Sequence, residues 1–450
     1  MNRLRITLKD GRRFVYPAAM AAVLVLLAGT ANAQVLTVRC VPSHTISSSC
    51  YVPPTEYTTI SAAVGAAVSG DIILVGPGTY KEYVTIGTDS LSLFGAQAGR
   101  DAREDRDDPK KESIVDATGT GYPTITISAP YVVVDGFTIQ GGTGVFPSSG
   151  GISLSGSLGT QVLNNIIQAN STGVLLTGAA GNVVERNRIK NNNGGAGQAV
   201  GCGVAALGGS FLSISDNEFV GNHAAAILMA PGCLFATITN NTSENDGSFA
   251  VFLGTTGNLF SHNRGRKFGA QGALPVFCDG SCSVDADAAV DIGFGNEFLE
   301  VSHNDLEEGE GSISHGIAFT PVFGSSGGDS EGVVVKNNTI VGFKGNGIVA
   351  ETDTTISPTL GMTRYSSIVG NEVRDNGLAG ISIAGAGVYN TNISLFDNEA
   401  EGNHVFDCQD TSLATGPGYT LGTHNTWFND AGNLSYPTGL CTPGRRHDRD

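Results

Sequence analysis

Short apolar runs alternate with glycine and asparagine along most of the chain. Clear examples are residues 173–176, 226–229, 250–253, 347–349 and 380–383. Each run has the length of a β-strand, is apolar on at least one face and is flanked by Gly or Asn. No amphipathic segment of helical length lies between these runs, which argues against alternating strands and helices. The pattern therefore predicts many short strands that are separated by tight turns.

Asparagine recurs at a regular place between these runs, in phrases of the form Asn-x-apolar. The last Asn of each phrase gives the series Asn165, Asn187, Asn217, Asn241, Asn263, Asn304, Asn338, Asn371 and Asn398. Successive spacings are 22, 30, 24, 22, 41, 34, 33 and 27 residues. A base period of 22 with insertions fits a coil of three short strands. Asn tolerates the left-handed conformation of a tight turn, and its amide can bond to the Asn one coil above.

These features predict an all-β fold, a parallel β-helix with three sheets. A single short strand could not bury its apolar face, but stacked coils share one continuous core. An antiparallel sandwich would not place Asn at the same point of every unit. One exception to the strands is residues 59–68, where Thr58 or Thr59 could cap a short helix. Its apolar face comprises Ile60, Ala63, Val64, Ala67 and Val68.

The N-terminal segment has the layout of a secretory signal peptide. Basic residues at Arg3, Arg5, Lys9, Arg12 and Arg13 precede an apolar run over 18–28 and the small-residue motif at 31–33. The run is too short to cross a bilayer, and no other segment has the length and apolarity of a membrane helix. We therefore expect export to the periplasm, the cell surface or the medium.

The domain boundaries follow from this layout. We expect a signal peptide over 1–33 and one β-helix domain over 34–443, followed by a disordered tail over 444–450. The short helix belongs to an N-terminal cap over 40–70, and a C-terminal cap covers 404–443. Residues 100–112 are rich in charges of both signs, which predicts a protruding solvated loop.

Eight cysteines in an exported chain point to disulfides rather than to thiols or zinc ligands. Cys40 with Cys50 and Cys408 with Cys441 would staple the two ends of the domain. Cys278 with Cys282 would close a very small loop, and a zinc site there lacks a second pair of ligands. The last two cysteines, Cys202 and Cys233, could link neighbouring coils.

The charge balance excludes some partners. The chain holds 25 Lys and Arg against 42 Asp and Glu, and residues 1–33 contain five of the bases and one of the acids. The remaining domain therefore has 20 bases and 41 acids, a net charge of −21. Such a protein is not expected to bind nucleic acid or an anionic membrane surface. An acidic polysaccharide would need a bridging cation.

The opening of the domain resembles a known family. Residues 57–60 (Tyr-Thr-Thr-Ile), 70–75 (Gly-Asp-Ile-Ile-Leu-Val), 77–80 (Pro-Gly-Thr-Tyr) and 84–86 (Val-Thr-Ile), together with Gly95, are similar to the start of pectin-lyase-like proteins. The later Asn-rich coils resemble the right-handed parallel β-helix repeat proteins. This resemblance implies a right-handed β-helix. It implies much less about chemistry, because the group includes lyases, hydrolases, epimerases, esterases and adhesins.

The catalytic motifs of the enzymes in that group are not reproduced in order. Residues 290–296 and 409–411 are similar to two pectinesterase phrases, but they occur in reverse order. Residues 188–190 and 314–316 resemble fragments of polygalacturonase motifs, of which the first comes too early. The Asp-Pro-His phrase of mannuronan epimerases and the Arg-rich motifs of pectate lyases are absent. No activity therefore transfers residue by residue.

One acidic segment offers candidate chemistry. Residues 278–310 hold ten acids and no Lys or Arg. Closely spaced carboxylates could bind Ca²⁺, with Asp285, Asp287 and Glu297 as ligands, or supply an acid and a base for glycosidic chemistry. The catalytic candidates are Asp291, Glu300 and His315. The alternative is a solvated acidic surface. His223 and His262 lie beside the Asn positions and are interpreted as turn or ladder residues.

Two functional hypotheses remain at this point. The first is a polysaccharide-binding or polysaccharide-modifying β-helix, whose ligand lies along one sheet face near residues 278–315. If it is an enzyme, the resemblance implies a polysaccharide lyase, hydrolase or epimerase. The second is a non-catalytic rod of the envelope or cell surface, with a structural or adhesive role. Turnover of a glycan would separate the two.

Overall fold

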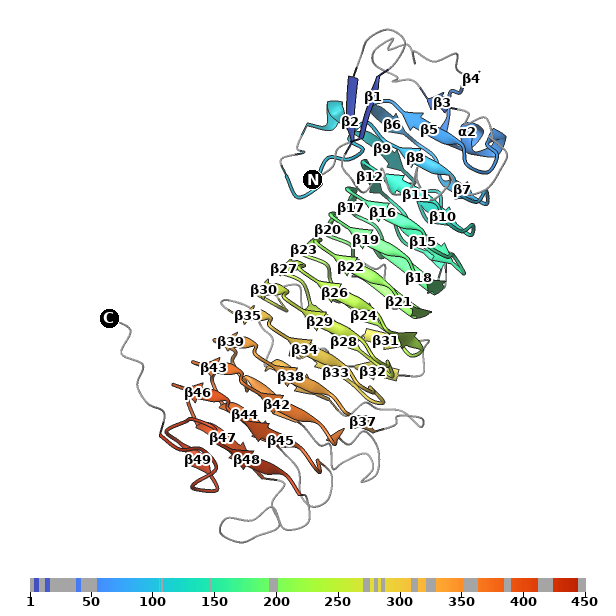
Figure 1. Ribbon diagram of the computed structural model, residues 1–450. Coiled ribbons are helices and arrows are strands. Elements are labelled where there is room, and N and C mark those ends of the chain that lie inside the picture. The colour runs from blue at the N-terminus through green and yellow to red at the C-terminus, as the bar shows by residue number, and fades with distance from the viewer. Residues whose placement is uncertain are drawn as a thin grey trace.

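The structure is a computed structural model in which strands stack into three long parallel sheets (Figure 1). It describes residues 57–443, apart from 105, 107, 146–147, 194–200, 270–287, 309–314, 321–328, 351–362, 384–389 and 412–423. Of the remaining chain it describes the backbone of the strands at 4–7, 13–16, 38–41, 55–56, 276–278 and 282–284. The predicted signal peptide and the tail over 444–450 lie outside the described residues, apart from the strands at 4–7 and 13–16.

A typical coil contributes one strand to each of three sheets, which we number so that the chain runs from sheet 1 through sheet 2 to sheet 3 within a coil. Sheet 1 consists of β7 (Val84–Ile86), β10 (Ile125–Ile127), β15 (Ile152–Ser155), β18 (Val174–Ala180), β21 (Cys202–Ser210) with β25 (Cys233–Leu234) beside its end, β24 (Ala225–Met229), β28 (Ser248–Phe252), β33 (Ala288–Ile292), β36 (His315–Phe319), β40 (Ile348–Ala350), β44 (Ala379–Ile383), β47 (Phe406–Asp410) and β49 (Ser435–Tyr436). Sheet 2 consists of β4 (Thr55–Glu56), β3 (Val38–Val41), β5 (Ile72–Val75), β8 (Ser92–Phe94), β11 (Val133–Asp135), β16 (Gln161–Leu163), β19 (Val183–Glu185), β22 (Ser213–Ser215), β26 (Thr237–Thr239), β29 (Leu259–Ser261), β34 (Glu300–Ser302), β38 (Val334–Lys336), β42 (Ser367–Val369), β45 (Ser394–Phe396) and β48 (Thr426–Phe428). Sheet 3 consists of β6 (Gly78–Tyr80), β9 (Ser113–Asp116), β12 (Phe137–Gln140), β17 (Ile166–Gln168), β20 (Arg188–Lys190), β23 (Glu218–Val220), β27 (Thr242–Glu244), β30 (Arg264–Arg266), β35 (Asp305–Glu307), β39 (Thr339–Val341), β43 (Glu372–Arg374) and β46 (Glu399–Glu401).

Short additional elements lie outside these sheets. They are the helix α2 (Ile60–Ala66), the 3₁₀ turn η1 (Pro109–Lys111), and the strand pairs β1 (Leu4–Thr7) with β2 (Arg13–Tyr16), β13 (Gly144–Val145) with β14 (Ser148–Ser149), β31 (Val276–Cys278) with β32 (Cys282–Val284), and β37 (Ser330–Glu331) with β41 (Thr363–Arg364). None of the described helices is long and apolar enough to span a bilayer.

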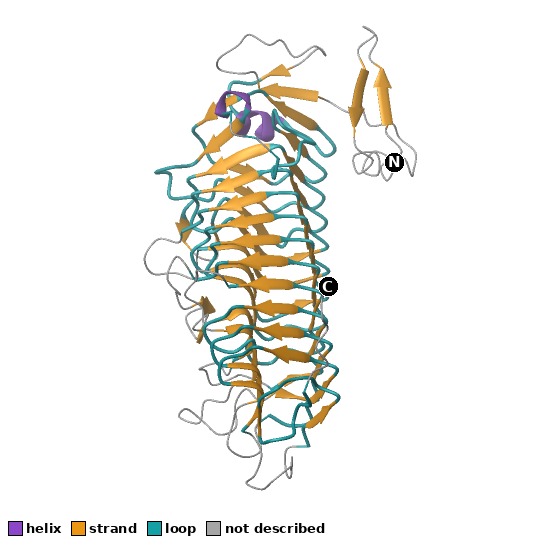
Figure 2. Ribbon diagram, turned by 90° about the vertical axis from the view of Figure 1, so that its left-hand side faces the viewer, coloured by secondary structure: helices purple, strands orange, loops and turns teal. Residues whose placement is uncertain are grey.

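The core is one continuous apolar column inside the three sheets. In a three-residue strand such as β20 or β23, the central side chain, Ile189 or Phe219, points inward and is buried. Its neighbours on either side are partly exposed, as the alternation of side chains in a strand requires. The orange strands in Figure 2 show the resulting stack. The predicted three-sheet parallel β-helix is therefore confirmed.

The predicted asparagine ladder runs through turn 2, the turn between sheets 2 and 3. From β16 onward each of these turns begins with two residues, of which the first has a positive φ and the second is the ladder residue. In Asn263, the backbone N–H and the Nδ2 both donate to Oδ1 of Asn304, at 2.9 and 3.1 Å. The same pair of hydrogen bonds repeats from Asn165 through Asn398, which donates to Asp430. All nine asparagines of the predicted series belong to this ladder.

A second ladder occupies turn 3, which leads from sheet 3 to sheet 1 of the next coil. It runs from Asn170 through Asn192 and Asn222, and it ends on Asp246. An aspartate can end such a ladder because its carboxylate only accepts hydrogen bonds. The amide of an asparagine must both accept from one coil and donate to another. The ladder in turn 2 likewise ends on an aspartate, Asp430.

The N-terminal helix confirms most of the sequence expectation. Thr59 caps α2 and accepts a hydrogen bond from the backbone N–H of Ala62, while Ile60, Ala63 and Val64 are buried against the first coils. Figure 2 shows this helix in purple at one end of the stack. Val68 differs from the prediction, because the helix ends before it and its side chain is exposed.

The C-terminal end is closed by the predicted staple. Cys408 and Cys441 form a disulfide, and Trp427 packs against both the core and this pair. The indole Nε1 of Trp427 donates to Oδ2 of Asp410 at 3.0 Å. Phe428, the next residue, is exposed and takes no part in the closure. The pairs at Cys40/Cys50 and Cys278/Cys282 involve side chains outside the described residues.

The charged loop over 100–112 is anchored rather than simply solvated. Arg106 and Glu112 form an ion pair in which both side chains are buried. The Arg106 guanidinium also donates to the carbonyl oxygens of Asn164 and Phe137. The loop therefore packs over turn 2 of the next coils. The sequence showed the balance of charges but not that this pair is buried.

The expected link between Cys202 and Cys233 is absent, and both are buried free thiols. Cys202 lies opposite Ala225, whereas Cys233 lies opposite Gly209, seven positions further along β21. At about 3.3 Å per residue this offset is roughly 20 Å, far beyond the reach of a disulfide. The prediction failed because adjacent coils do not bring residues together unless their registers match.

Burial raises the pKa of the Cys202 thiol to about 12 and that of Cys233 to about 11. Because the thiolate is the reactive form, we expect neither thiol to react with an alkylating reagent in the native protein. Peptide mapping after labelling, with and without denaturant, checks this expectation. Labelling of either residue under native conditions would contradict the buried register.

Candidate functional site

The outer face of sheet 1 carries the most unusual of the predicted site residues. Strand pairing aligns one central, outward position across the whole sheet. This outer row comprises Thr85, Thr126, Ser153, Leu175, Ala205, Leu228, Val251, Asp291, Ala318, Val349, Ser382, Gln409 and Tyr436. Asp291 is the one ionisable carboxylate in the row, and its neighbours on either side are Val251 and Ala318.

Asp291 is held in a defined position on β33. Its residue is fully buried, and the hydroxyl of Thr320 donates to Oδ1 at 2.5 Å. Thr320 directly follows β36, the neighbouring strand of the same sheet. Val251 and Ala318 on either side of it are buried as well, so the carboxylate is desolvated and depends on hydrogen bonds such as the one from Thr320. This environment differs from that of a solvated surface acid.

His315 lies on the same outer face as Asp291 but not beside it. It begins β36 opposite Ala288, three positions before the residue that faces Asp291. This offset is roughly 10 Å along the strands at about 3.3 Å per residue. The Nδ1 of His315 accepts a hydrogen bond from the backbone N–H of Asn346 at 3.0 Å. The imidazole is therefore held by the next coil, on the face that carries Asp291.

Glu300 lies on a different sheet from Asp291 and His315. It begins β34 of sheet 2 and forms an ion pair with Lys336 at 3.0 Å. Partial burial alone would raise the pKa of Glu300, but hydrogen bonds from Ser302 and Lys336 outweigh that effect and lower it. The structure thus places Asp291 and His315 on one face but apart along the strands, and it places Glu300 on another sheet.

The candidate metal ligands are not brought together among the described residues. Glu297 is exposed in turn 1, between β33 and β34, where its backbone pairs with Thr256 and Glu331. Asp285 and Asp287 lie outside the described residues. Within the described part of the chain, no three His, Cys, Asp or Glu side chains cluster in a way that could hold a metal ion.

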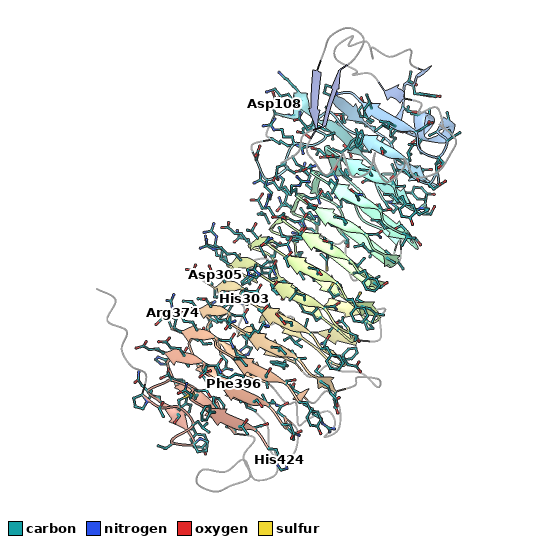
Figure 3. The ribbon with its side chains drawn as sticks, viewed as in Figure 1. Asp108, His303, Asp305, Arg374, Phe396 and His424 are labelled. Atoms are coloured by element: carbon teal, nitrogen blue, oxygen red, sulfur yellow. A yellow bond between two sulfur atoms is a disulfide. The ribbon has the colours of Figure 1, made fainter. Side chains whose placement is uncertain are left out.

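The histidines of turn 2 have the structural role that the sequence predicted for His262. The rings of His262 and His303 are parallel, with centroids 4.9 Å apart, and Nε2 of His303 lies 3.2 Å from Nδ2 of Asn337. Both histidines have positive φ values. Figure 3 shows His303 and Asp305 on the same side of the solenoid, away from His424. The two imidazole rings therefore stack on each other as their turns do in successive coils.

Two further buried acids have perturbed pKa values. Desolvation raises the pKa of Asp246 to about 7, although Ser243 and Asn222 donate hydrogen bonds to it. Desolvation likewise raises the pKa of Glu308 to about 8, with opposing effects from the backbone of Phe268 and from Lys344. Asp246 could have been found from the sequence, because it replaces Asn in the turn 3 ladder. The acidic run itself gave no sign that Glu308 is buried.

Comparison with known proteins supports the fold assignment. The family model described as "Right handed beta helix region" matches residues 115–265. No curated protein sequence matches the chain. The handedness and the resemblance to pectin-lyase-like proteins are therefore confirmed at the level of the fold.

Several solved structures share this architecture at low sequence identity. The catalytic unit of a thermostable GH87 α-1,3-glucanase from Streptomyces thermodiastaticus strain HF3-3 is 16% identical, with a TM-score of 0.54 over 84% of this chain and 66% of that chain. The catalytic domain of a GH87 α-1,3-glucanase in complex with tetrasaccharides is 15% identical, with a TM-score of 0.55 over 80% and 63% of the two chains. An alginate lyase from Paenibacillus sp. str. FPU-7 is 14% identical, with a TM-score of 0.47 over 77% and 98%. The chain thus spans about two thirds of each glucanase chain, and at these identities the likeness is one of fold.

Proposed function

Because the chain is a right-handed parallel β-helix, we propose that it is an exported protein that binds or modifies a polysaccharide on the outer face of sheet 1. The observation that carries this proposal is Asp291, a fully buried carboxylate in an outer row that is otherwise uncharged. The neighbouring glucanases support a polysaccharide ligand by analogy of fold. The disulfide between Cys408 and Cys441 supports export, because such bonds persist in oxidising compartments.

The charge of the protein favours a neutral glycan. A domain with 20 bases and 41 acids repels a polyuronate, whereas a glucan meets no such barrier. Asp291 is fully buried in this structure, so the outer face of sheet 1 must open in the proposed complex before the carboxyl accepts hydrogen bonds from sugar hydroxyls or acts as an acid towards a glycosidic oxygen. Thr320 fixes the carboxyl, and His315 contacts a sugar further along the same face. A hydrolase would need a second carboxyl group at the reacting bond.

The proposal is tested with the purified mature protein, soluble α-1,3-glucan and alginate, each with and without Ca²⁺. Polymer length and retained protein are followed together. We expect retention or shortening of the glucan by the wild type. The Asp291→Asn variant should lose at least about tenfold in shortening, or in affinity for an α-1,3-linked tetrasaccharide, since a buried charge-assisted contact is removed. Asp305→Asn, at a partly exposed position on sheet 3 where the carboxylate pairs with Arg264, is the control.

The possible results separate the hypotheses. Thermal unfolding of Asp291→Asn, and of Thr320→Val as a second variant, shows whether the fold is intact. If correctly folded Asp291→Asn protein acts like the wild type, the site on sheet 1 is not where the ligand binds. If no polymer is retained or changed by the wild type, the function proposed here fails and a structural or adhesive rod becomes the better account.

A further inference from the structure

Turn 1, the turn from sheet 1 to sheet 2, carries a row of residues with the same unusual backbone. Two positions before each sheet 2 strand from β8 onward, one residue has a positive φ. This row comprises Ser90, Tyr131, Gly159, Gly181, Phe211, Phe235, Gly257, Phe298, Gly332, Tyr365, Asn392 and His424. Backbone hydrogen bonds join each of the aromatic members to the next coil, as from the N–H of Phe298 to the carbonyl oxygen of Glu331. The row therefore follows the solenoid axis along one edge, which we call the turn 1 edge.

The aromatic residues of this edge are not explained by the backbone. The left-handed region favours Gly, Asn and Asp, and it is an outlier for a bulky side chain. The equivalent row in turn 2 has the same conformation but carries polar residues or glycine, such as Asn240, His303 and Gly370. On the turn 1 edge five aromatic residues have the same conformation, and the exposed fraction of each residue is between 50% and 68%. These are Tyr131, Phe211, Phe235, Phe298 and Tyr365.

The rings form four platforms along the edge, which are Tyr131, the stacked pair Phe211 and Phe235, Phe298, and Tyr365. A Cβ placed on Gly159, Gly257 or Gly332 would lie 2.7, 2.5 or 2.9 Å from a ring carbon of the aromatic residue one coil before it. Each of these rings therefore lies against the backbone of the following glycine, and half or more of the residue still faces solvent. Phe211 instead stacks on Phe235, with centroids 5.6 Å apart. The glycine coils thus set the aromatic platforms apart.

Polar side chains lie beside the platforms in the C-terminal half of the edge. Glu297, Glu331 and Arg364 each precede a member of the row, and their backbones pair in succession. Arg364 is held by Asp329 at 3.2 Å, and Glu297 and Glu331 are exposed. Sugar rings present C–H faces that pack on aromatic rings and hydroxyls that bond to carboxylates and guanidinium groups. This half of the edge offers both kinds of contact.

The spacing of the platforms indicates a linear ligand. Phe235, Phe298 and Tyr365 are separated by two coils each, roughly 10 Å at about 4.8 Å per strand. A protein partner would need one contiguous interface of about 1,200 Å² or more, which rings divided by glycines do not supply. An extended chain of sugars can instead place rings on successive platforms.

We infer that the turn 1 edge is a second polysaccharide-binding site, which holds a neutral, linear glycan parallel to the solenoid axis. This inference rests on the function proposed above and adds a site distinct from the face of sheet 1. The edge binds long polymer, whereas the face around Asp291 holds the segment that is recognised or changed. Glu297, which the sequence offered as a metal ligand, becomes a sugar-contacting residue on this edge.

The test compares a double variant, Phe298→Asn with Tyr365→Asn, with the control Phe428→Asn. Asparagine accepts a positive φ, so the double variant removes two rings without straining the turn. Phe428 is equally exposed but lies in β48, outside the edge. Sedimentation with insoluble α-1,3-glucan measures binding, and soluble tetrasaccharides in a separate assay report on the sheet 1 site.

We expect the double variant to lose at least about tenfold in sedimentation with insoluble glucan, while its action on or affinity for tetrasaccharides stays unchanged. The variant Asp291→Asn should show the reverse. If the double variant sediments like the wild type, the edge is not a binding site, even where Asp291→Asn confirms the other site. A lower melting temperature with unchanged sedimentation would mean that the rings only cover the glycines, and this result also overturns the inference. If the wild type binds neither form of glucan, the proposed function fails together with the edge.

Discussion

Replacing Asn304 with alanine is expected to lower the free energy of unfolding by about 3–5 kcal/mol. This is the largest loss that we expect from a single substitution in the turns. Oδ1 of Asn304 accepts both the backbone N–H and the Nδ2 of Asn263. Its own Nδ2 donates to Oδ1 of Asn338 and to the carbonyl oxygen of Phe260. Alanine would leave buried donors and acceptors on three coils without partners, and water cannot reach them.

The adjacent turns provide a matched control for this variant. Asn337 occupies the exposed first position of the next turn 2, so Asn337→Gly keeps the positive φ and removes only the surface amide. Denaturant unfolding of both variants against the wild type measures the difference. A loss below about 1 kcal/mol for Asn304→Ala would contradict the claim that the ladder stabilises the solenoid.

Stability is expected to fall as the pH rises from about 4 to about 8, and Asp246 should account for much of the change. Its pKa is about 7 in the folded protein, above the ordinary value of 3.8, because it is desolvated. A group whose pKa is raised by folding stabilises the protein below the unfolded pKa, and this stability is lost as the pH passes the folded pKa. A shift of about three units corresponds to roughly 4 kcal/mol.

The substitution Asp246→Asn should remove this dependence and raise stability at pH 8. Its amide oxygen can still accept the two hydrogen bonds from Asn222, its Nδ2 can donate to the hydroxyl of Ser243, and no charge is buried. Denaturant unfolding at pH 5 and pH 8 measures the effect. Asp375→Asn, at an exposed turn, should leave the profile unchanged. Glu308→Gln should reduce the pH dependence of stability that Asp246 does not account for, because desolvation raises the pKa of Glu308 to about 8. Equal pH profiles for the wild type and Asp246→Asn would show that Asp246 titrates normally.

The regular part of the fold could be predicted because its cause is local. Turn 2 needs a residue that tolerates a positive φ and then an amide that both donates and accepts, so Asn recurs from Asn165 to Asn398 whatever the length of the other turns. The capping helix and the C-terminal disulfide were likewise visible in local spacing. These signals do not depend on how the coils are aligned.

Features that depend on register could not be predicted in this way. Cys202 and Cys233 lie on neighbouring coils, but the strand register places them seven positions apart along β21. Glu300 is near Asp291 along the chain, yet a turn separates them onto different sheets. The turn 1 edge was missed because its five aromatic residues are dispersed among glycines, and only the strand pairing aligns them. Burial of Arg106 with Glu112 likewise requires the neighbouring coils.

The most direct measurement is a crystal structure of residues 34–450 with a tetrasaccharide of α-1,3-linked glucose. We expect sugar on the outer face of sheet 1, with a hydroxyl or glycosidic oxygen within hydrogen-bond distance of Asp291. A longer oligosaccharide should place further rings on Phe298 and Tyr365. If sugar binds only at other places, or if no sugar binds at saturating concentration, the proposal that this β-helix acts on a polysaccharide through the outer face of sheet 1 is contradicted.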